Sequence, residues 1–181
     1  MKQPFDLHWQ LRPYDPPWSK QLLRFDVAFP VDEIVFQDGD RHTKLSNAEL
    51  NKPAVRGTIT RMNIVCRHEP FSWAIVVRNA RGIRCRDVFE AIHVAFDEKL
   101  TLGERVLVRN RRAVDNAFRL RCNVAPGRPA IGRSLEWKRV DVLLDQTIFL
   151  GLTPPKFGTM WVLNLGSRPA IPPHREHLPT L

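Results

Sequence analysis

Few cysteines and no long apolar run occur in this sequence, and both absences limit the classes of protein it can belong to. The three cysteines are odd in number and form no CxxC pair, so we expect reduced thiols rather than a disulfide framework or a cysteine-rich zinc module. The longest apolar runs, WAIVV and IFLGL, fall far short of the roughly 20 residues that cross a bilayer. No apolar signal-peptide core follows the first methionine. We therefore predict an intracellular protein, cytoplasmic or nuclear, without a transmembrane segment.

The common catalytic and cofactor-binding motifs are missing as well. The sequence has no Walker A, GxGxxG, HExxH or GxSxG pattern. It also lacks the spacings typical of a zinc finger, an RNP-type RNA-binding domain or a KH domain. We therefore predict no catalytic residue, no cofactor and no metal, although a chain without these motifs can still be an enzyme.

Cys85 stands at the start of a predicted helix, between Arg84 and Arg86, where free backbone N–H groups and positive charge would stabilise a thiolate. A catalytic thiol also needs a base within reach. His93 lies eight residues further on, about two helical turns away, and Cys85 shares the apolar side of the helix with Val88. The pattern favours a buried thiol over a nucleophile.

Two other polar groups have incomplete metal-site patterns. Asp38, Asp40 and His42 lie in the segment FQDGDRHTKL, whose DxD spacing occurs in calcium loops, but the glycine at the sixth position of an EF-hand is missing. His174 and His177 are spaced like zinc ligands, but no third ligand is evident beside them. We expect a polar turn at the first place and no metal at the second.

Length and composition fit one globular domain. Of the 181 residues, 43% are hydrophobic and 26% are charged, and a domain of this size buries enough surface to fold without disulfides or metals. Alternating apolar residues predict a β-hairpin over about 57–79, turned at Pro70. Two helices, about 85–100 and 103–122, follow it. We predict an α+β fold in which an antiparallel sheet with this hairpin is covered on one face by the two helices.

Shorter elements and the two ends complete the predicted organisation. The shorter elements are strands over 22–29, 33–36 and 160–166, and a short helix or strand within 138–152. Ser46 and Glu49 have the spacing of a capping box at the start of a single helical turn. The chain divides into a proline- and tryptophan-rich strap (1–20), the α+β domain (21–166) and a proline-rich tail (167–181).

Arginines of the second predicted helix are the strongest candidate for a binding surface. Residues 101–140 hold ten Lys+Arg against three Asp+Glu, in a chain of net charge +9. The arginines that recur at helical spacing are Arg105, Arg109, Arg112 and Arg119. They lie opposite a predicted inner side made of Val106, Leu107, Asn110, Ala113, Val114, Ala117 and Phe118. Because each guanidinium can bond two oxygens, we predict polyanion or partner binding here, with a merely solvated helix face as the alternative.

Several landmarks, taken in order, resemble a known family. They are LLRFDVAFP, LNKPAVRGTITRMNIV, FSWAIVV, IRCRDVFEAIH, RVDVLLDQTIFLGL and MWVLNL. Spanning about 7–166, they resemble a family of uncharacterised domains abundant in mushroom-forming basidiomycete fungi. Arg84 stands where that family has a threonine helix cap, and we expect Asp87 to compensate for it. The family has no established activity, so the resemblance implies a fold and a source but no site residue.

These patterns leave three functional hypotheses. The first is a non-enzymatic intracellular interaction module that binds an acidic protein or another polyanion through the arginine face. The second is RNA or DNA binding through the same arginines, which would depend strongly on salt. The third is an unrecognised hydrolase-type enzyme, whose candidate residues are His8, Asp38, Asp40, His42 and His68. The sequence predicts no oligomeric state.

Overall fold

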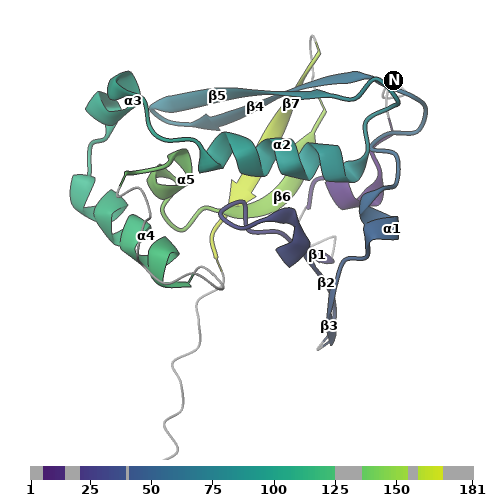
Figure 1. Ribbon diagram of the computed structural model, residues 1–181, viewed down its shortest axis with the longest axis horizontal. Helices are drawn as coiled ribbons and strands as arrows, with labels where there is room; N and C mark the ends of the chain where they lie inside the picture. The colour runs from purple at the N-terminus through teal and green to yellow at the C-terminus, as the bar shows by residue number, and fades with distance from the viewer. Residues whose placement is uncertain (1–5, 15–20, 40, 125–135, 155–158, 169–181) are drawn as a thin grey trace, which may run out of the picture.

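A four-stranded sheet, a three-stranded sheet and five α-helices make up the described part of the chain (Figure 1). The structure is a computed structural model, and it describes residues 6–14, 21–39, 41–124, 136–154 and 159–168. The mixture of helices and sheets confirms the predicted α+β class.

The larger sheet contains the predicted hairpin. Its strands β4 (Arg61–His68) and β5 (Phe71–Arg78) pair antiparallel. The other two strands, β6 (Ile148–Thr153) and β7 (Met160–Gly166), give the order β5-β4-β7-β6. Because β7 runs parallel to β4, the sheet is mixed rather than antiparallel throughout. Sequence periodicity carries no information on which strand a C-terminal strand pairs with.

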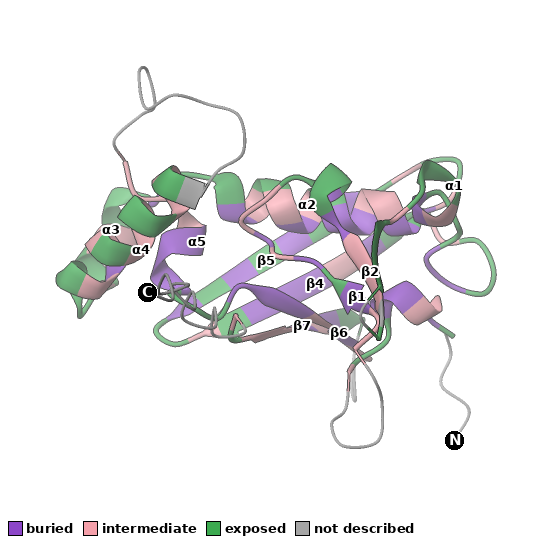
Figure 2. Cartoon of the chain, turned by 90° about the horizontal axis from the view of Figure 1, so that it is seen from below, coloured by how far each residue is buried: buried purple, intermediate pink, exposed green. Residues whose placement is uncertain are grey.

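One face of this sheet is buried and the other faces solvent. The buried side chains of β5 are Phe71, Trp73, Ile75 and Val77, and the exposed ones are Ser72, Ala74, Val76 and Arg78. This alternation follows from the two-residue period of a strand, and it is visible along β5 in Figure 2. The apolar side faces α2 (Cys85–Asp97), where the rings of Trp73 and Phe96 meet edge to face with centroids 5.6 Å apart.

Helix α2 begins as the sequence predicts. Arginine offers no acceptor to the first turn, and the Asp87 carboxylate accepts hydrogen bonds from the Arg84 backbone N–H and from the Asn79 side-chain amide, both at 2.8 Å. The expected compensation by Asp87 is therefore confirmed. The buried side of the helix carries Cys85, Val88, Phe89, Ile92 and Phe96.

The second predicted helix is two helices. Helix α3 (Leu102–Leu107) and helix α4 (Arg111–Val124) are separated at Val108, whose backbone is extended. Asn110, predicted on the inner side, instead accepts a hydrogen bond from the Ala113 N–H at 3.0 Å and caps α4. The predicted inner side is therefore wrong for its first half, because Val106 is 80% exposed and Leu107 is also exposed. Helix α4 packs mainly on α5 (Arg139–Val142), so α2 is the helix that covers the sheet (Figure 1).

The smaller sheet has the order β1 (Leu23–Arg24), β2 (Val35–Asp38) and β3 (Arg41–Lys44). The strand predicted over 22–29 is shorter than expected, and the one predicted over 33–36 has the expected length but lies two residues later. The smaller sheet joins the larger sheet through backbone bonds between residues 25–27, which follow β1, and residues 147–149 at the start of β6. Beside it, α1 (Asn47–Leu50) is capped by the Ser46 hydroxyl, which accepts from the Glu49 N–H at 3.2 Å, as predicted.

Residues 6–14 lie against the domain. A short 3-10 helix, Trp9–Leu11, buries Leu11 completely, and the Tyr14 N–H donates to the Leu150 carbonyl of β6 at 2.7 Å. At this contact Gly151 has a φ of 101°, and a Cβ there would lie 2.2 Å from the Arg12 carbonyl oxygen. Only glycine fits such an approach. Of the predicted tail, residues 167–168 are described, and residues 169–181, with His174 and His177, lie outside the described residues.

Candidate functional site

The four arginines of the predicted binding face do not share one helix. Arg105 lies on α3, Arg109 lies between the helices, and Arg112 and Arg119 lie on α4. The break at Val108 separates the first of them from the last two. Figure 1 shows α3 and α4 as distinct segments at one end of the molecule.

Arg105 is held within the protein. Its Nε donates to the Leu100 carbonyl at 3.2 Å, and its guanidinium lies 3.5 Å from the Glu136 carboxylate. Lys99 lies 2.6 Å from the same carboxylate. With about a third of its side chain exposed (36%), Arg105 is less available to a partner than the other three arginines.

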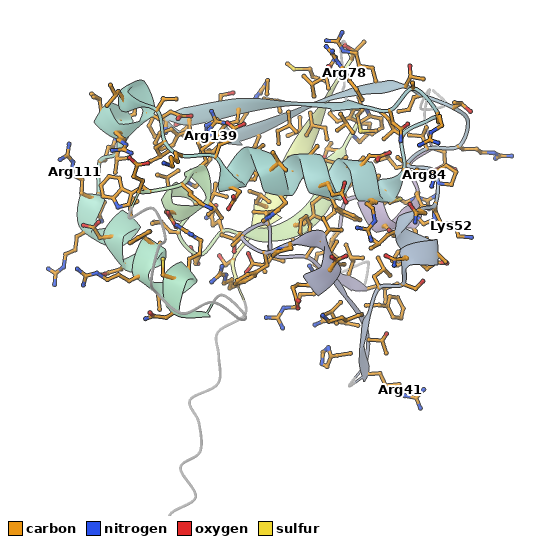
Figure 3. The ribbon with its side chains drawn as sticks, viewed as in Figure 1. Arg41, Lys52, Arg78, Arg84, Arg111 and Arg139 are labelled. Atoms are coloured by element: carbon orange, nitrogen blue, oxygen red, sulfur yellow. The ribbon has the colours of Figure 1, made fainter. Side chains whose placement is uncertain are left out.

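The remaining three are exposed and have no carboxylate partner among the described residues. Arg112 and Arg119 are seven residues apart, so they stand on the same side of α4, about 10 Å apart along its axis. Arg111, which was not singled out from the sequence, is also exposed and lies at the outer end of the molecule (Figure 3). We call Arg109, Arg111, Arg112 and Arg119 the α4 arginine surface.

The opposite side of α4 is anchored by an ion pair. Asp141 of α5 is buried, and its carboxylate accepts two hydrogen bonds from the Arg121 guanidinium, at 2.7 and 2.9 Å, and one from the Lys138 N–H at 2.8 Å. Burial lowers the pKa of Arg121, but the hydrogen bond and charge of Asp141 outweigh this and raise the pKa above its usual value. The Trp137 indole adds a bond to Asp115 at 2.9 Å.

A cavity of about 300 Å³ lies beside this ion pair, between α4 and the loop after α5. Its apolar lining includes Ala117, Leu120 and Leu144, and its basic residues are Arg121 and Arg168. Arg121 is paired with Asp141, and Arg168 lies 2.7 Å from the Asp26 carboxylate. The positive charge in this cavity is therefore already neutralised, unlike that of the α4 arginine surface.

The three described histidines of the hydrolase hypothesis lie in separate places. His42 lines a cavity of about 400 Å³ with Arg24 and Glu33, and neither His8 nor His68 lines it. A ring nitrogen of His68 lies 3.1 Å from the Val142 carbonyl. Burial is the main cause that lowers the pKa of His8. Asp40 and the side chain of Asp38 lie outside the described residues.

Cys85 is as inaccessible as the sequence predicts. It is fully buried, and burial raises the pKa of its thiol to about 12. His93 is turned away, because its Nδ1 lies 3.1 Å from the Val27 carbonyl. Within the described ranges no three His, Cys, Asp or Glu side chains gather where they could hold a metal. None of the described helices has the length and apolar composition needed to cross a membrane.

A second basic region was missed in the sequence. Residues 51–86 hold eight Lys+Arg, and Glu69 is their sole acid. Of these eight, Arg86 is the one with a described carboxylate partner, lying near Asp32 and Glu90. The excess of Lys and Arg over Asp and Glu in residues 51–86 indicates this region from the sequence alone. Helical spacing of arginines does not indicate it, because Arg61, Arg67 and Arg78 lie on strands.

Fold and surface together define an α+β domain that exposes two sets of arginines without described carboxylate partners. The chain belongs to the family described as "Family of unknown function (DUF6699)", whose model matches residues 23–159. This confirms the expected membership in an uncharacterised family. No curated protein and no solved structure matches the chain.

Proposed function

We propose that this protein is a non-enzymatic interaction module that binds an acidic protein partner through the α4 arginine surface. We infer that it works inside the cell. This inference is supported by the three cysteines, none of which forms a disulfide within the described residues. The proposed source, a mushroom-forming basidiomycete, rests on the sequence landmarks alone.

The supporting observation is a difference among basic residues that are neighbours in sequence. Lys138 pairs with Asp97, Arg139 with Glu98 and Glu104, and Arg121 with Asp141. The α4 arginine surface has no such described partner. Exposed arginines such as Arg112 and Arg119, which are about 10 Å apart along α4, can engage several carboxylates at once. A partner with clustered Asp or Glu residues is the complement to this surface.

A charge-reversal variant tests the proposal. In Arg109→Glu/Arg112→Glu, two cations become anions at exposed positions, so the fold should be retained. We expect this variant to elute from immobilised heparin at clearly lower salt than the wild type, and to bind fluorescent polyglutamate at least about tenfold more weakly. Circular dichroism checks that the fold is unchanged.

A matched control distinguishes the effect of the α4 arginine surface from the effect of the protein's net charge. Arg41→Glu/Lys52→Glu changes the charge equally at exposed residues far from α4 (Figure 3). It should elute close to the wild type. If both variants elute alike, retention depends on net charge alone and the proposal is wrong.

Nucleic acid is the alternative partner of this surface. Each neutralised DNA phosphate contributes about −0.9 to the slope of log K against log salt. A steep slope with duplex DNA, together with tighter binding to DNA than to polyglutamate at 150 mM salt, would show that the partner of this surface is a nucleic acid and not an acidic protein.

A further inference from the structure

The solvent face of the β4–β5 hairpin holds two arginines directly opposite each other. Arg61 of β4 and Arg78 of β5 are partners in the antiparallel register, and both are exposed. The Asn79 N–H donates to the Thr60 carbonyl at 3.1 Å, so the adjacent pair 61/78 is of the non-hydrogen-bonded kind. In such pairs the Cα atoms are about 4.5 Å apart and the side chains stand closest.

Like charges placed directly opposite destabilise a sheet. No described carboxylate relieves this pair, since neither arginine forms an ion pair within the described residues. The Nε of Arg61 donates to the Asn63 side-chain oxygen at 3.2 Å, which directs Arg61 along the strand. Arg78 lies on the side of β5 away from α2 (Figure 3). Two guanidinium groups are thus available to one oxyanion.

The rest of this face is mainly small and apolar rather than basic. From the arginine pair towards the hairpin turn it carries Val76 opposite Asn63 and Ala74 opposite Val65, with Met160 and Val162 of β7 alongside, and Val65 is buried among these neighbours. Val76 is 45% exposed. Both aromatic rings of β5, Phe71 and Trp73, point to the opposite, buried face. At the far end stands Arg67, opposite Ser72.

The dimensions of the face suit a single helix. Arg67 is six positions after Arg61, which corresponds to about 20 Å of strand, and the three strands β5, β4 and β7 together are about 10–14 Å wide. An α-helix is about 10 Å in diameter, and about 13 residues cover 20 Å. A globular partner needs roughly 800 Å² on each side, more than this strip offers by itself.

We propose that this face binds an acidic amphipathic helix of a protein partner, with one or more carboxylates held between Arg61 and Arg78. The apolar side of the helix would lie on Ala74, Val76 and Met160. This surface is separate from the α4 arginine surface and does not depend on it.

A protein segment fits this face better than a nucleic acid does. Single-stranded nucleic acid binds on exposed aromatic rings and along continuous positive charge. The described part of this face has no aromatic side chain, and its charge is confined to the two ends. Apolar residues between the charged ends match apolar residues of a peptide instead.

The test uses the full ¹⁵N-labelled chain and a helical peptide of about 13 residues, with glutamates in its first turn and alanine and leucine along one side. We expect the peptide to shift the amide resonances of residues 61–67 and 72–78. Arg61→Gln/Arg78→Gln should weaken its binding at least about tenfold. Ala74→Glu, which keeps both arginines but places a negative charge on the strip, should weaken it as well.

The control variant is Arg41→Gln/Lys52→Gln, which changes the charge equally at exposed residues outside both proposed surfaces and should bind the peptide as the wild type does. Unchanged binding in Arg61→Gln/Arg78→Gln, or equal weakening in this variant and in the control, would overturn the inference and leave the α4 proposal standing. An absence of hairpin shifts, or shifts there caused by oligothymidylate at lower concentration than by the peptide, would also overturn it.

Discussion

Basic residues around α5 and basic residues on the open face of the β4–β5 hairpin differ in their surroundings. Around α5, Arg121 of α4 and Arg139 of α5 have less than a fifth of their side chains exposed, and both are paired with carboxylates. On the hairpin, Arg61 and Arg78 face solvent and lie next to each other without a described carboxylate partner. The same residue type thus occurs in a compensated and an uncompensated setting in one domain.

This difference indicates which arginines stabilise the fold and which remain for binding. A buried charge has lost its hydration and must be compensated inside the protein. An exposed charge keeps its hydration, so the fold tolerates it unpaired at a cost of tenths of a kcal/mol. Substitutions at α5 should therefore change stability, and substitutions on the hairpin should change binding.

The largest effect is expected at Asp141. Its side chain is 1% exposed, so Asp141→Ala leaves the Arg121 charge in a poorly hydrated site without its partner. Loss of one member of a buried ion pair costs about 3–5 kcal/mol. Urea unfolding should show a decrease of this size in the free energy of unfolding.

Asp145, in the loop after α5, is the matched control. Its side chain is exposed, and Asp145→Ala should change stability by no more than about 0.5 kcal/mol. If the two alanine variants unfold at similar urea concentrations, the division between compensated and uncompensated charges does not hold.

A smaller effect is expected at Glu104. Its carboxylate accepts from the Trp73 indole at 2.6 Å, from the Thr101 N–H at 2.7 Å and from Arg139 at 3.0 Å. Glu104→Gln should lower the free energy of unfolding by about 1–3 kcal/mol, because bonds to a charged acceptor are replaced by weaker ones. Thermal unfolding at pH 7 measures the loss.

The same residue predicts a pH dependence. Partial burial raises the pKa of Glu104, but its hydrogen bonds to Thr101 and Trp73 and the charge of Arg139 outweigh this and hold the pKa below the usual 4.5. The stabilisation is therefore complete above about pH 4.5 and is lost as the pH falls through the lowered pKa. The wild type and Glu104→Gln should converge in stability on acidification, and a constant difference down to pH 2 would contradict this.

The smallest effect has the opposite sign. Arg78→Glu replaces a like-charge pair with a cross-strand ion pair to Arg61, which should raise the free energy of unfolding by about 0.2–1 kcal/mol. The gain should shrink at 0.5 M salt, since exposed charges are screened. A variant that is more stable yet fails to bind the acidic peptide would separate binding from stability at this position. A destabilised variant would show that Arg78 contributes to the fold.

Local patterns predicted much of the fold. The alternation along 57–79, the Ser46 cap and the role of Asp87 depend on residues close in sequence, and all three are confirmed. The parallel pairing of β7 with β4 joins residues about 100 positions apart, and periodicity contains no information on it.

The candidate surface was only partly predictable. Asn110 has a side chain that favours helix starts. Because Asn110 also fits the helical spacing of apolar residues over 103–122, the sequence predicted one continuous helix there instead of α3 and α4. The sequence could not show that Arg105 is engaged, because its partner Glu136 lies 31 positions further along the chain. The helical spacing predicted that Arg109, Arg112 and Arg119 are exposed. Only the structure shows that they have no carboxylate partner among the described residues.

The position of β3 has a consequence for how the protein behaves in concentrated solution. This strand lies at the edge of its sheet, and all four of its residues, Arg41 to Lys44, are exposed. An open strand edge can join the same edge of another molecule. If the β3 edges of two molecules paired antiparallel, Arg41 of each molecule would lie close to Lys44 of the other. The repulsion between these positive charges keeps the molecules apart. Polyanions or high salt that neutralise it should make the protein more prone to edge-to-edge self-association.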